Sequence, residues 1–150
     1  MSNENDLMKL YSQRILALAA EIPHTGRLDT PQATAKKRSP LCGSTVTVDV
    51  DVTDGRVSRY AADVKACALG QASASVVGAA AIGRTREEIE KARDELKSML
   101  RDGGDAPSAP FDGLEALLPA REYKNRHASI MLTLDALSEA VAQAEAAQTV

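Results

Sequence analysis

Aromatic residues are scarce in this sequence of 150 residues. They make up 3% of it, as three tyrosines, one phenylalanine and no tryptophan. The core must therefore be built from Val, Leu, Ile, Ala and Met, which favours close packing of helices on a sheet. The sequence also has no run of 18 or more apolar residues and opens on an acidic, polar segment, so it predicts neither a membrane-spanning helix nor a signal peptide. We expect a cytoplasmic protein with no membrane partner.

A basic excess is also missing. The 18 Lys and Arg residues are outnumbered by 21 Asp and Glu residues, which gives a formal net charge of -3. Such a chain has no broad positive field for phosphate backbones, so no nucleic-acid partner is expected. The length fits one compact domain. We therefore predict a single domain over residues 1–150, with a flexible loop at about residues 101–110, where Gly, Asp, Ser and Pro gather.

Cysteines are limited to Cys42 and Cys67. In a reducing compartment two such residues are more often free thiols or metal ligands than a structural disulfide. The arrangement is not Cys-x-x-Cys, so a thiol-redox function, with the two residues acting as a dithiol, ranks low. A metal or cluster site built on thiols is the stronger hypothesis.

Hydrophobic periodicity predicts most of the secondary structure. Alternating Val and polar residues predict a half-buried strand, and a capping box at Thr85–Glu88 marks the start of one helix. The turn Thr53-Asp54-Gly55 joins two strands into a hairpin. The expected strands are residues 33–38 at an edge, 45–52 and 56–64. The expected helices are residues 3 or 4 to 20, 68–81, 85 to about 100, 111–118 ending at Pro119, and 120–146.

The predicted hairpin brings the two cysteines to the same end of a sheet. Cys42 precedes its first strand and Cys67 follows its second strand. Cys67 would also begin a helix, where unpaired amides favour a thiolate, and Lys65 adds to that positive charge. Gly43 lets the backbone bend close to whatever the sulfur of Cys42 holds. A small buried hydrophobic residue is the alternative interpretation for Cys67, and a tight turn feeding a strand for Cys42.

His127 is a candidate third ligand because it falls on the apolar stripe of the last predicted helix. Two thiolates and an imidazole suit zinc, or iron with sulfide. A histidine on such a stripe is as often a core residue hydrogen-bonded to backbone. Both interpretations stay open at this point.

The motifs resemble the iron–sulfur cluster scaffold family of the NifU N-terminal/IscU type. The similar segments are Ser39-Pro40-Leu41-Cys42-Gly43, Lys65-Ala66-Cys67-Ala68 with Gln71-Ala72-Ser73-Ala74-Ser75, and Arg126-His127-Ala128-Ser129 with Leu132 and Ala136-Leu137. The resemblance implies an α+β fold, with a three-stranded, mainly antiparallel sheet, helices packed on it and a long C-terminal helix. It also implies a scaffold that is not an enzyme. Such scaffolds take sulfur from a cysteine desulfurase, assemble a [2Fe–2S] cluster from iron and sulfide, and pass it to apo iron–sulfur proteins. Many also bind zinc in the same pocket.

Two departures from the family pattern concern the ligands. The acid that follows Cys-Gly in the family is Ser44 here, and the third cysteine is absent. One register puts Ala128 in its place, and another puts Ser129 there. Serine hydroxyls are far weaker ligands for iron or zinc than thiolates, so Ser44 and Ser129 are weak candidates beside Cys42, Cys67 and His127.

Two functions follow from this comparison. The first is an iron–sulfur scaffold or carrier that binds iron and sulfide, or zinc, through Cys42, Cys67 and His127. The second is a degenerate scaffold that binds zinc as a structural or regulatory protein and docks a cysteine desulfurase. Only Leu118-Pro119 matches the chaperone-recognition segment of the family. Recognition by a dedicated chaperone is therefore not expected.

Overall fold

The computed structural model describes residues 11–40 and 43–148. The expected start of the first helix and the candidate ligand Cys42 lie outside these residues. None of the helices in the described ranges is both long enough and apolar enough to span a bilayer.

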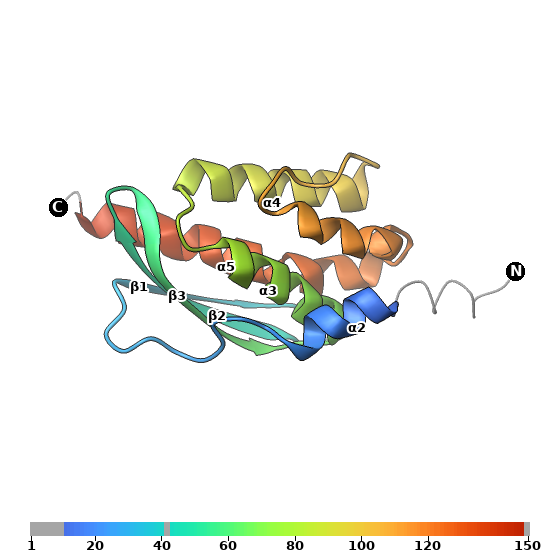
Figure 1. The fold of residues 1–150 in the computed structure, drawn as a ribbon, viewed down its shortest axis with the longest axis horizontal. Helices are drawn as coiled ribbons and strands as arrows, with labels where there is room; N and C mark the ends of the chain where they lie inside the picture. The colour runs from blue at the N-terminus through green and yellow to red at the C-terminus, as the bar shows by residue number, and fades with distance from the viewer. Residues whose placement is uncertain (1–10, 41–42, 149–150) are drawn as a thin grey trace, which may run out of the picture.

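A three-stranded antiparallel sheet forms one side of the molecule (Figure 1). Its strands are β1 (Ala33–Arg38), β2 (Thr45–Thr53) and β3 (Arg56–Lys65), in that spatial order. β1 pairs only with β2 and is an edge strand, as its run of basic residues predicts. The four alternating valines of β2 are at most 2% exposed and face the core, which confirms the predicted half-buried strand. They are Val46, Val48, Val50 and Val52.

The turn between β2 and β3 brings the start of one strand beside the end of the other. Asp54 and Gly55 have φ angles of 53° and 76°, as a tight type I′ hairpin turn requires. The register pairs Thr45 with Lys65. The residues just before β2 therefore lie next to those just after β3, as the sequence predicted.

Five helices in the described chain pack on one face of the sheet and on one another. They are α2 (Gln13–Ala20), α3 (Ala68–Ala80), α4 (Arg86–Arg101), the 3₁₀ helix η1 (Asp112–Glu122) and α5 (Lys124–Gln148). α5 contacts β1 and β2, α3 contacts β3, and α4 and η1 pack beyond them (Figure 1). The predicted α+β class, with its long C-terminal helix, is confirmed.

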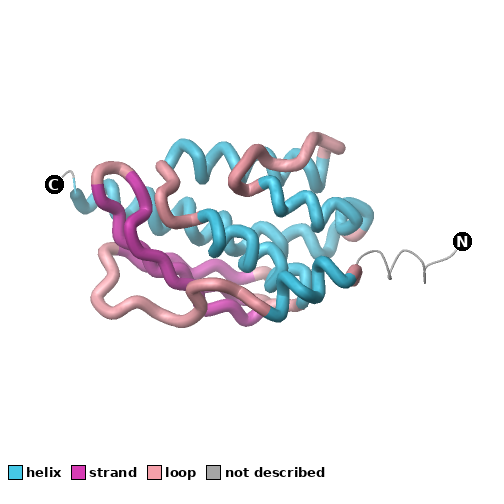
Figure 2. The backbone as a smooth tube through the Cα atoms, viewed as in Figure 1, coloured by secondary structure: helices cyan, strands magenta, loops and turns pink. Residues whose placement is uncertain are grey.

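The opposite face of β2 is covered by the connection before β1, which runs along the strands (Figure 2). The side chain of Asp49 is fully buried beneath it. Arg27 donates to this carboxylate at 2.7 Å, the amide of Leu28 at 3.0 Å and the hydroxyl of Thr34 at 2.6 Å. Burial raises the pKa of Asp49, but these hydrogen bonds and the charge of Arg27 outweigh it and hold the pKa below its ordinary value. Asp49 fastens this connection to the sheet.

Two predicted helix boundaries are wrong, and the first predicted helix is not continuous. Tyr11 and Ser12 are not helical, and Ser12 caps a helix that starts at Gln13, with its hydroxyl accepting the amide of Ile15. The short helix does not stop before Pro119, since a 3₁₀ helix runs through it to Glu122. Proline fixes a φ that suits this helix and costs it only one donor. The last helix begins at Lys124, because Tyr123 leaves the helical conformation with φ of -112° and ψ of 77°.

Candidate functional site

Cys67 occupies the N-cap of α3, directly after β3. Its φ and ψ are -68° and 171°, and its carbonyl accepts the amide of Gln71, which closes the first turn of the helix. The residue is a free thiol that is only partly exposed. The hairpin and the capping geometry together aim this thiol at the end of the sheet, as the sequence predicted.

Three side chains from distant parts of the sequence meet at this thiol. The Cys67 sulfur lies 3.5 Å from the hydroxyl oxygen of Ser129 on α5. Ser129 in turn donates to the hydroxyl of Ser44, just before β2, at 3.3 Å. Because Ser129 has one proton and gives it to Ser44, it accepts from the Cys67 thiol. The structure therefore joins Ser44, Cys67 and Ser129 in one chain of hydrogen bonds, which we call the thiol–hydroxyl site.

Backbone hydrogen bonds join the residues on the two sides of the short loop that precedes Ser44. The amide of Ser39 donates to the carbonyl of Ser44 at 2.8 Å, and the amide of Gly43 donates to the carbonyl of Ser39 at 2.9 Å. Gly43 has a φ of 72°, a conformation that glycine adopts at little cost. Both ends of this short loop are thus fixed beside the thiol–hydroxyl site. Cys42 is the residue before Gly43 in the sequence and lies outside the described residues.

α3 and α5 approach each other closely at the thiol–hydroxyl site. A Cβ atom built at Gly70 would lie 2.7 Å from the hydroxyl oxygen of Ser129 and 2.8 Å from the Cβ of Ala66. One turn further along α3, the hydroxyl of Ser73 donates to the carbonyl of Ile130 at 2.7 Å. Gly70 therefore sets the distance between Ser129 and Cys67. Gly70 was not predicted as a site residue, although a glycine in the first turn after Cys67 is a signal of close helix packing.

His127 lies on the buried side of α5 but not among the three residues of the thiol–hydroxyl site. Its Nε2 is 3.0 Å from the carbonyl oxygen of Ala120 and 3.1 Å from that of Arg121. Both partners are acceptors, so Nε2 carries a proton and donates. Residues two positions apart on an α-helix point about 200° apart, so His127 and Ser129 face different neighbours. The geometry of His127 is that of a core histidine hydrogen-bonded to backbone, one of the two interpretations left open above.

The two registers for the third ligand position are distinguished by the same geometry. Ala128 lies along the surface hollows beside Arg101, whereas Ser129 is 1% exposed and reaches Cys67. Ser129 is thus the residue of α5 that faces the thiol. The described residues supply one thiol and two hydroxyls to this place. Within residues 11–40 and 43–148, no group of three or more His, Cys, Asp and Glu side chains is placed to hold a metal ion.

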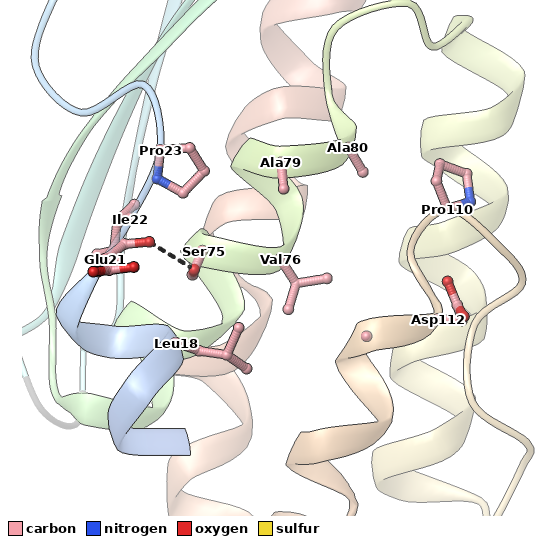
Figure 3. A pocket seen from close by; sticks show the side chains of 11 residues that line it. Leu18, Glu21, Ile22, Pro23, Ser75, Val76, Ala79, Ala80, Pro110 and Asp112 are labelled. Atoms are coloured by element: carbon pink, nitrogen blue, oxygen red, sulfur yellow. Dashed lines mark hydrogen bonds between the residues drawn. The ribbon is translucent and has the colours of Figure 1, made fainter. Parts of the chain in front are cut away.

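A separate hollow of about 650 Å³ lies between α2, α3 and the start of η1 (Figure 3). Its wall is mainly apolar, with Leu18, Val76 and Ala80 facing it, and the hydroxyl of Ser75 donates to the carbonyl of Glu21 at one side. None of Ser44, Cys67 and Ser129 lines this hollow. It is not part of the thiol–hydroxyl site.

A single family model matches almost the whole chain. The family model described as "NifU-like N terminal domain" matches residues 10–149. Among curated proteins, the iron–sulfur cluster assembly scaffold protein IscU of Thermotoga maritima is 27% identical over 132 residues, covering 88% of this chain and 92% of its own length. The IscU scaffold protein of Streptococcus pyogenes serotype M1 is 25% identical over 125 residues, covering 83% and 78%.

Solved structures give the same result. The crystal structure of a nitrogen-fixing NifU-like protein (N-terminal) from Brucella abortus superposes with a TM-score of 0.91 at 44% identity, covering 94% of this chain and 98% of that one. A putative iron–sulfur cluster assembly scaffold protein for the SUF system from Fervidobacterium islandicum AW-1 superposes with a TM-score of 0.81, covering 89% and 98%. Its identity is 19%, so this second likeness concerns the fold alone.

Proposed function

This chain belongs to the family of NifU-like N-terminal domains, and from that premise we propose that it is a scaffold on which an iron–sulfur cluster is assembled and from which the cluster is passed on. One observation carries the proposal: the side chains of Ser44, Cys67 and Ser129 meet at the end of the sheet although they come from three separate elements. The motif resemblance assigns these three residues to the segments of the family's first, second and third ligands. The curated relatives, named as cluster assembly scaffolds, support the same function.

The proposed ligands are the thiolates of Cys42 and Cys67. Soft thiolates bind the iron of iron–sulfur clusters, so the donor chemistry of these residues fits a [2Fe–2S] cluster or iron as cargo. Ser129 stands in the third position, and its hydroxyl either binds iron weakly or donates a hydrogen bond to the Cys67 thiolate once the thiol proton has left. In the thiol form Ser44 accepts from Ser129. If Ser129 turns its single proton to the Cys67 thiolate, Ser44 donates to Ser129 instead and still orients it. His127, which sequence analysis ranked first for the third position, instead fastens the start of α5 to the end of η1.

A hydroxyl in the third position suits a carrier that must release its cargo. Serine gives up its proton far less readily than cysteine and binds iron more weakly. A cluster held by two thiolates and one hydroxyl is therefore bound less firmly than one held by three thiolates. In this proposal, sulfur comes from a cysteine desulfurase and the finished cluster goes to apo iron–sulfur proteins. The chain works in the reducing cytoplasm as a scaffold and not as an enzyme.

Anaerobic reconstitution tests the proposal. The purified protein is incubated with ferrous iron, cysteine and a cysteine desulfurase, and iron, acid-labile sulfide and visible absorption are then measured after gel filtration. We expect a coloured protein with about two iron and two sulfide per cluster, and loss of the colour in Cys42→Ala and in Cys67→Ala. A colourless wild-type protein would overturn the proposal.

The serine at Ser129 also favours a second candidate function. A site that has exchanged one thiolate for a hydroxyl fits a degenerate scaffold that binds zinc, as a structural or regulatory protein that docks a desulfurase. The same experiment separates the two. Stoichiometric zinc in the protein as purified, with no iron or sulfide taken up on reconstitution, would favour this second function.

A further inference from the structure

Basic side chains gather in a groove between β1, α4 and α5. The groove encloses about 350 Å³ and contains both basic and acidic groups. Its basic residues are Lys37, Arg38, Arg93, Lys97 and Arg101. This concentration stands out in a chain whose formal net charge is -3. In the sequence alone, the run Lys36-Lys37-Arg38 allows two interpretations, a docking surface for an acidic partner or a solvated strand edge.

The groove continues into a neighbouring hollow of about 430 Å³. The two share Arg101 and Ala128, and the second hollow adds Lys124 and His127. Arg93 and Arg101 are eight positions apart on α4, which corresponds to about 12 Å along the helix axis. The basic side chains therefore follow a line and do not converge on one point. We call the two hollows together the basic groove.

Few of these cations are neutralised by neighbouring carboxylates. Lys37 pairs with Glu139 at 3.0 Å, and Arg93 lies 3.9 Å from Asp94 and donates to Ser138. Among residues 11–40 and 43–148, the ion pairs include none made by the other four, which are Arg38, Lys97, Arg101 and Lys124. Asp135 is the carboxylate at the floor, and it is surrounded by Lys37, Arg93, Lys97 and Arg101. The basic groove keeps a positive surplus.

One end of the basic groove adjoins the thiol–hydroxyl site. Arg38 is paired with Thr45 in the sheet, and Thr45 follows Ser44 in the chain. Ala128, in the wall of the groove, precedes Ser129 on α5. A molecule lying in the groove would therefore lie next to the thiol–hydroxyl site.

We propose that the basic groove docks an acidic segment of the protein that receives the cluster. The proposal rests on the function proposed above. The line of cations matches an extended peptide, since about 12 Å of groove holds roughly four residues at 3.3 Å each. A phosphate ion would use only one or two of the cations. A nucleic-acid backbone needs a broad positive field, which a chain of formal net charge -3 does not have outside this short line of cations.

A binding experiment with a defined acidic peptide tests this docking. Fluorescein-labelled hexaglutamate is titrated with the full-length apo protein at low salt, and anisotropy is recorded. Lys97→Glu reverses an exposed charge in the groove, and Lys91→Glu makes the same change on the same helix outside it. We expect Lys97→Glu to weaken binding about tenfold and Lys91→Glu to change it less than twofold. Equal weakening by the two variants would overturn the proposal.

Two further measurements identify the ligand and separate this inference from the proposed function. Millimolar phosphate or a short oligonucleotide that displaces hexaglutamate as well as unlabelled peptide does would show an anion or nucleic-acid site, and the docking proposal would be wrong. Cluster content is measured separately after reconstitution with inorganic sulfide. Suppose that Lys97→Glu weakens peptide binding but the wild type takes up no cluster on reconstitution. The groove would then be a site for acidic segments, and the scaffold function would be contradicted. If the wild type takes up a cluster but Lys97→Glu binds the peptide as tightly as the wild type does, the scaffold function would be supported and the docking proposal would be wrong.

Discussion

The sulfur of Cys67 lies 3.5 Å from the hydroxyl oxygen of Ser129, although the two residues are 62 positions apart. The contact joins the N-cap of α3 to the second turn of α5. It identifies Ser129 as the residue that faces the thiol from the last helix.

Removing the imidazole of His127 is expected to affect stability and not cargo. His127→Ala loses the hydrogen bonds to the carbonyls of Ala120 and Arg121 and leaves buried acceptors without a donor, which costs about 1–3 kcal/mol in the free energy of unfolding. Urea unfolding measures this loss. Iron and sulfide content after reconstitution should equal that of the wild type. His127→Gln, which keeps an amide donor, is the matched control. A loss of iron in both variants would show that His127 is a ligand.

Adding one methyl group at Gly70 is expected to disturb the site from the helix side. Gly70→Ala places a Cβ 2.7 Å from the Ser129 hydroxyl and 2.8 Å from Ala66, so α3 and α5 must separate. Such overpacking costs about 1–3 kcal/mol, although Gly to Ala ordinarily stabilises a helix. The double variant Gly70→Ala with Ser129→Ala should be less unstable than the sum of the two single variants, because the nearest clash is gone. Strict additivity in thermal or urea unfolding would contradict the close approach.

Neutralising Asp49 is expected to loosen the connection that covers the sheet. Its carboxylate is fully buried and accepts from Arg27, Leu28 and Thr34. Asp49→Asn should lower the free energy of unfolding at pH 7 by about 1–3 kcal/mol. Asp54→Asn is the control, because Asn tolerates the positive φ of this turn residue.

The same carboxylate predicts how stability depends on pH. Since the folded pKa of Asp49 is below its ordinary value of 3.8, its contribution is present above that value and is lost as pH falls through the folded pKa. Asp49→Asn should therefore show a shallower loss of stability on acidification than the wild type. Parallel curves for the two proteins between pH 5 and pH 2, measured by urea unfolding, would contradict this role of Asp49.

Tyr60 carries a buried hydroxyl for which the described residues provide no hydrogen-bond partner. Burial raises the pKa of this phenol above its usual range. Tyr60→Phe removes the unpaired group, so stability should stay the same or rise by about 1 kcal/mol. Tyr123→Phe, at a partly exposed position, should change it by less than about 0.5 kcal/mol. A marked loss of stability in Tyr60→Phe would show that the hydroxyl is paired in solution.

Local patterns predicted most of the elements that lead to the site. The alternating valines, the Asp-Gly turn and the capping box at Thr85 depend on neighbouring residues, and all three appear as predicted. The boundaries at Pro119 and Tyr123 were wrong because a 3₁₀ helix has no clear periodic signal. The burial of Asp49 was also not predicted, since it depends on a loop 21 positions away that folds back over the sheet.

The site was predictable in its parts but not in its assembly. The sequence indicated Cys67 at a helix start and left the third position open between Ala128, Ser129 and His127. Which of the three faces Cys67 depends on the rotation of α5 about its axis, and this rotation is set by packing against α3 at Gly70 and Ser73. Neither contact follows from periodicity in one helix. For the same reason the groove between β1, α4 and α5 escaped prediction.

The most direct test of the central claim is the rate at which the protein loses its cluster when the residue at position 129 is changed. Wild type, Ser129→Cys and Ser129→Ala are reconstituted without oxygen in the presence of a reductant, and iron and acid-labile sulfide per chain are followed over time. If Ser129 stands in the third ligand position, Ser129→Cys should retain the cluster at least about ten times longer than the wild type, and Ser129→Ala should retain it for the shortest time. Equal retention by all three proteins would contradict the account.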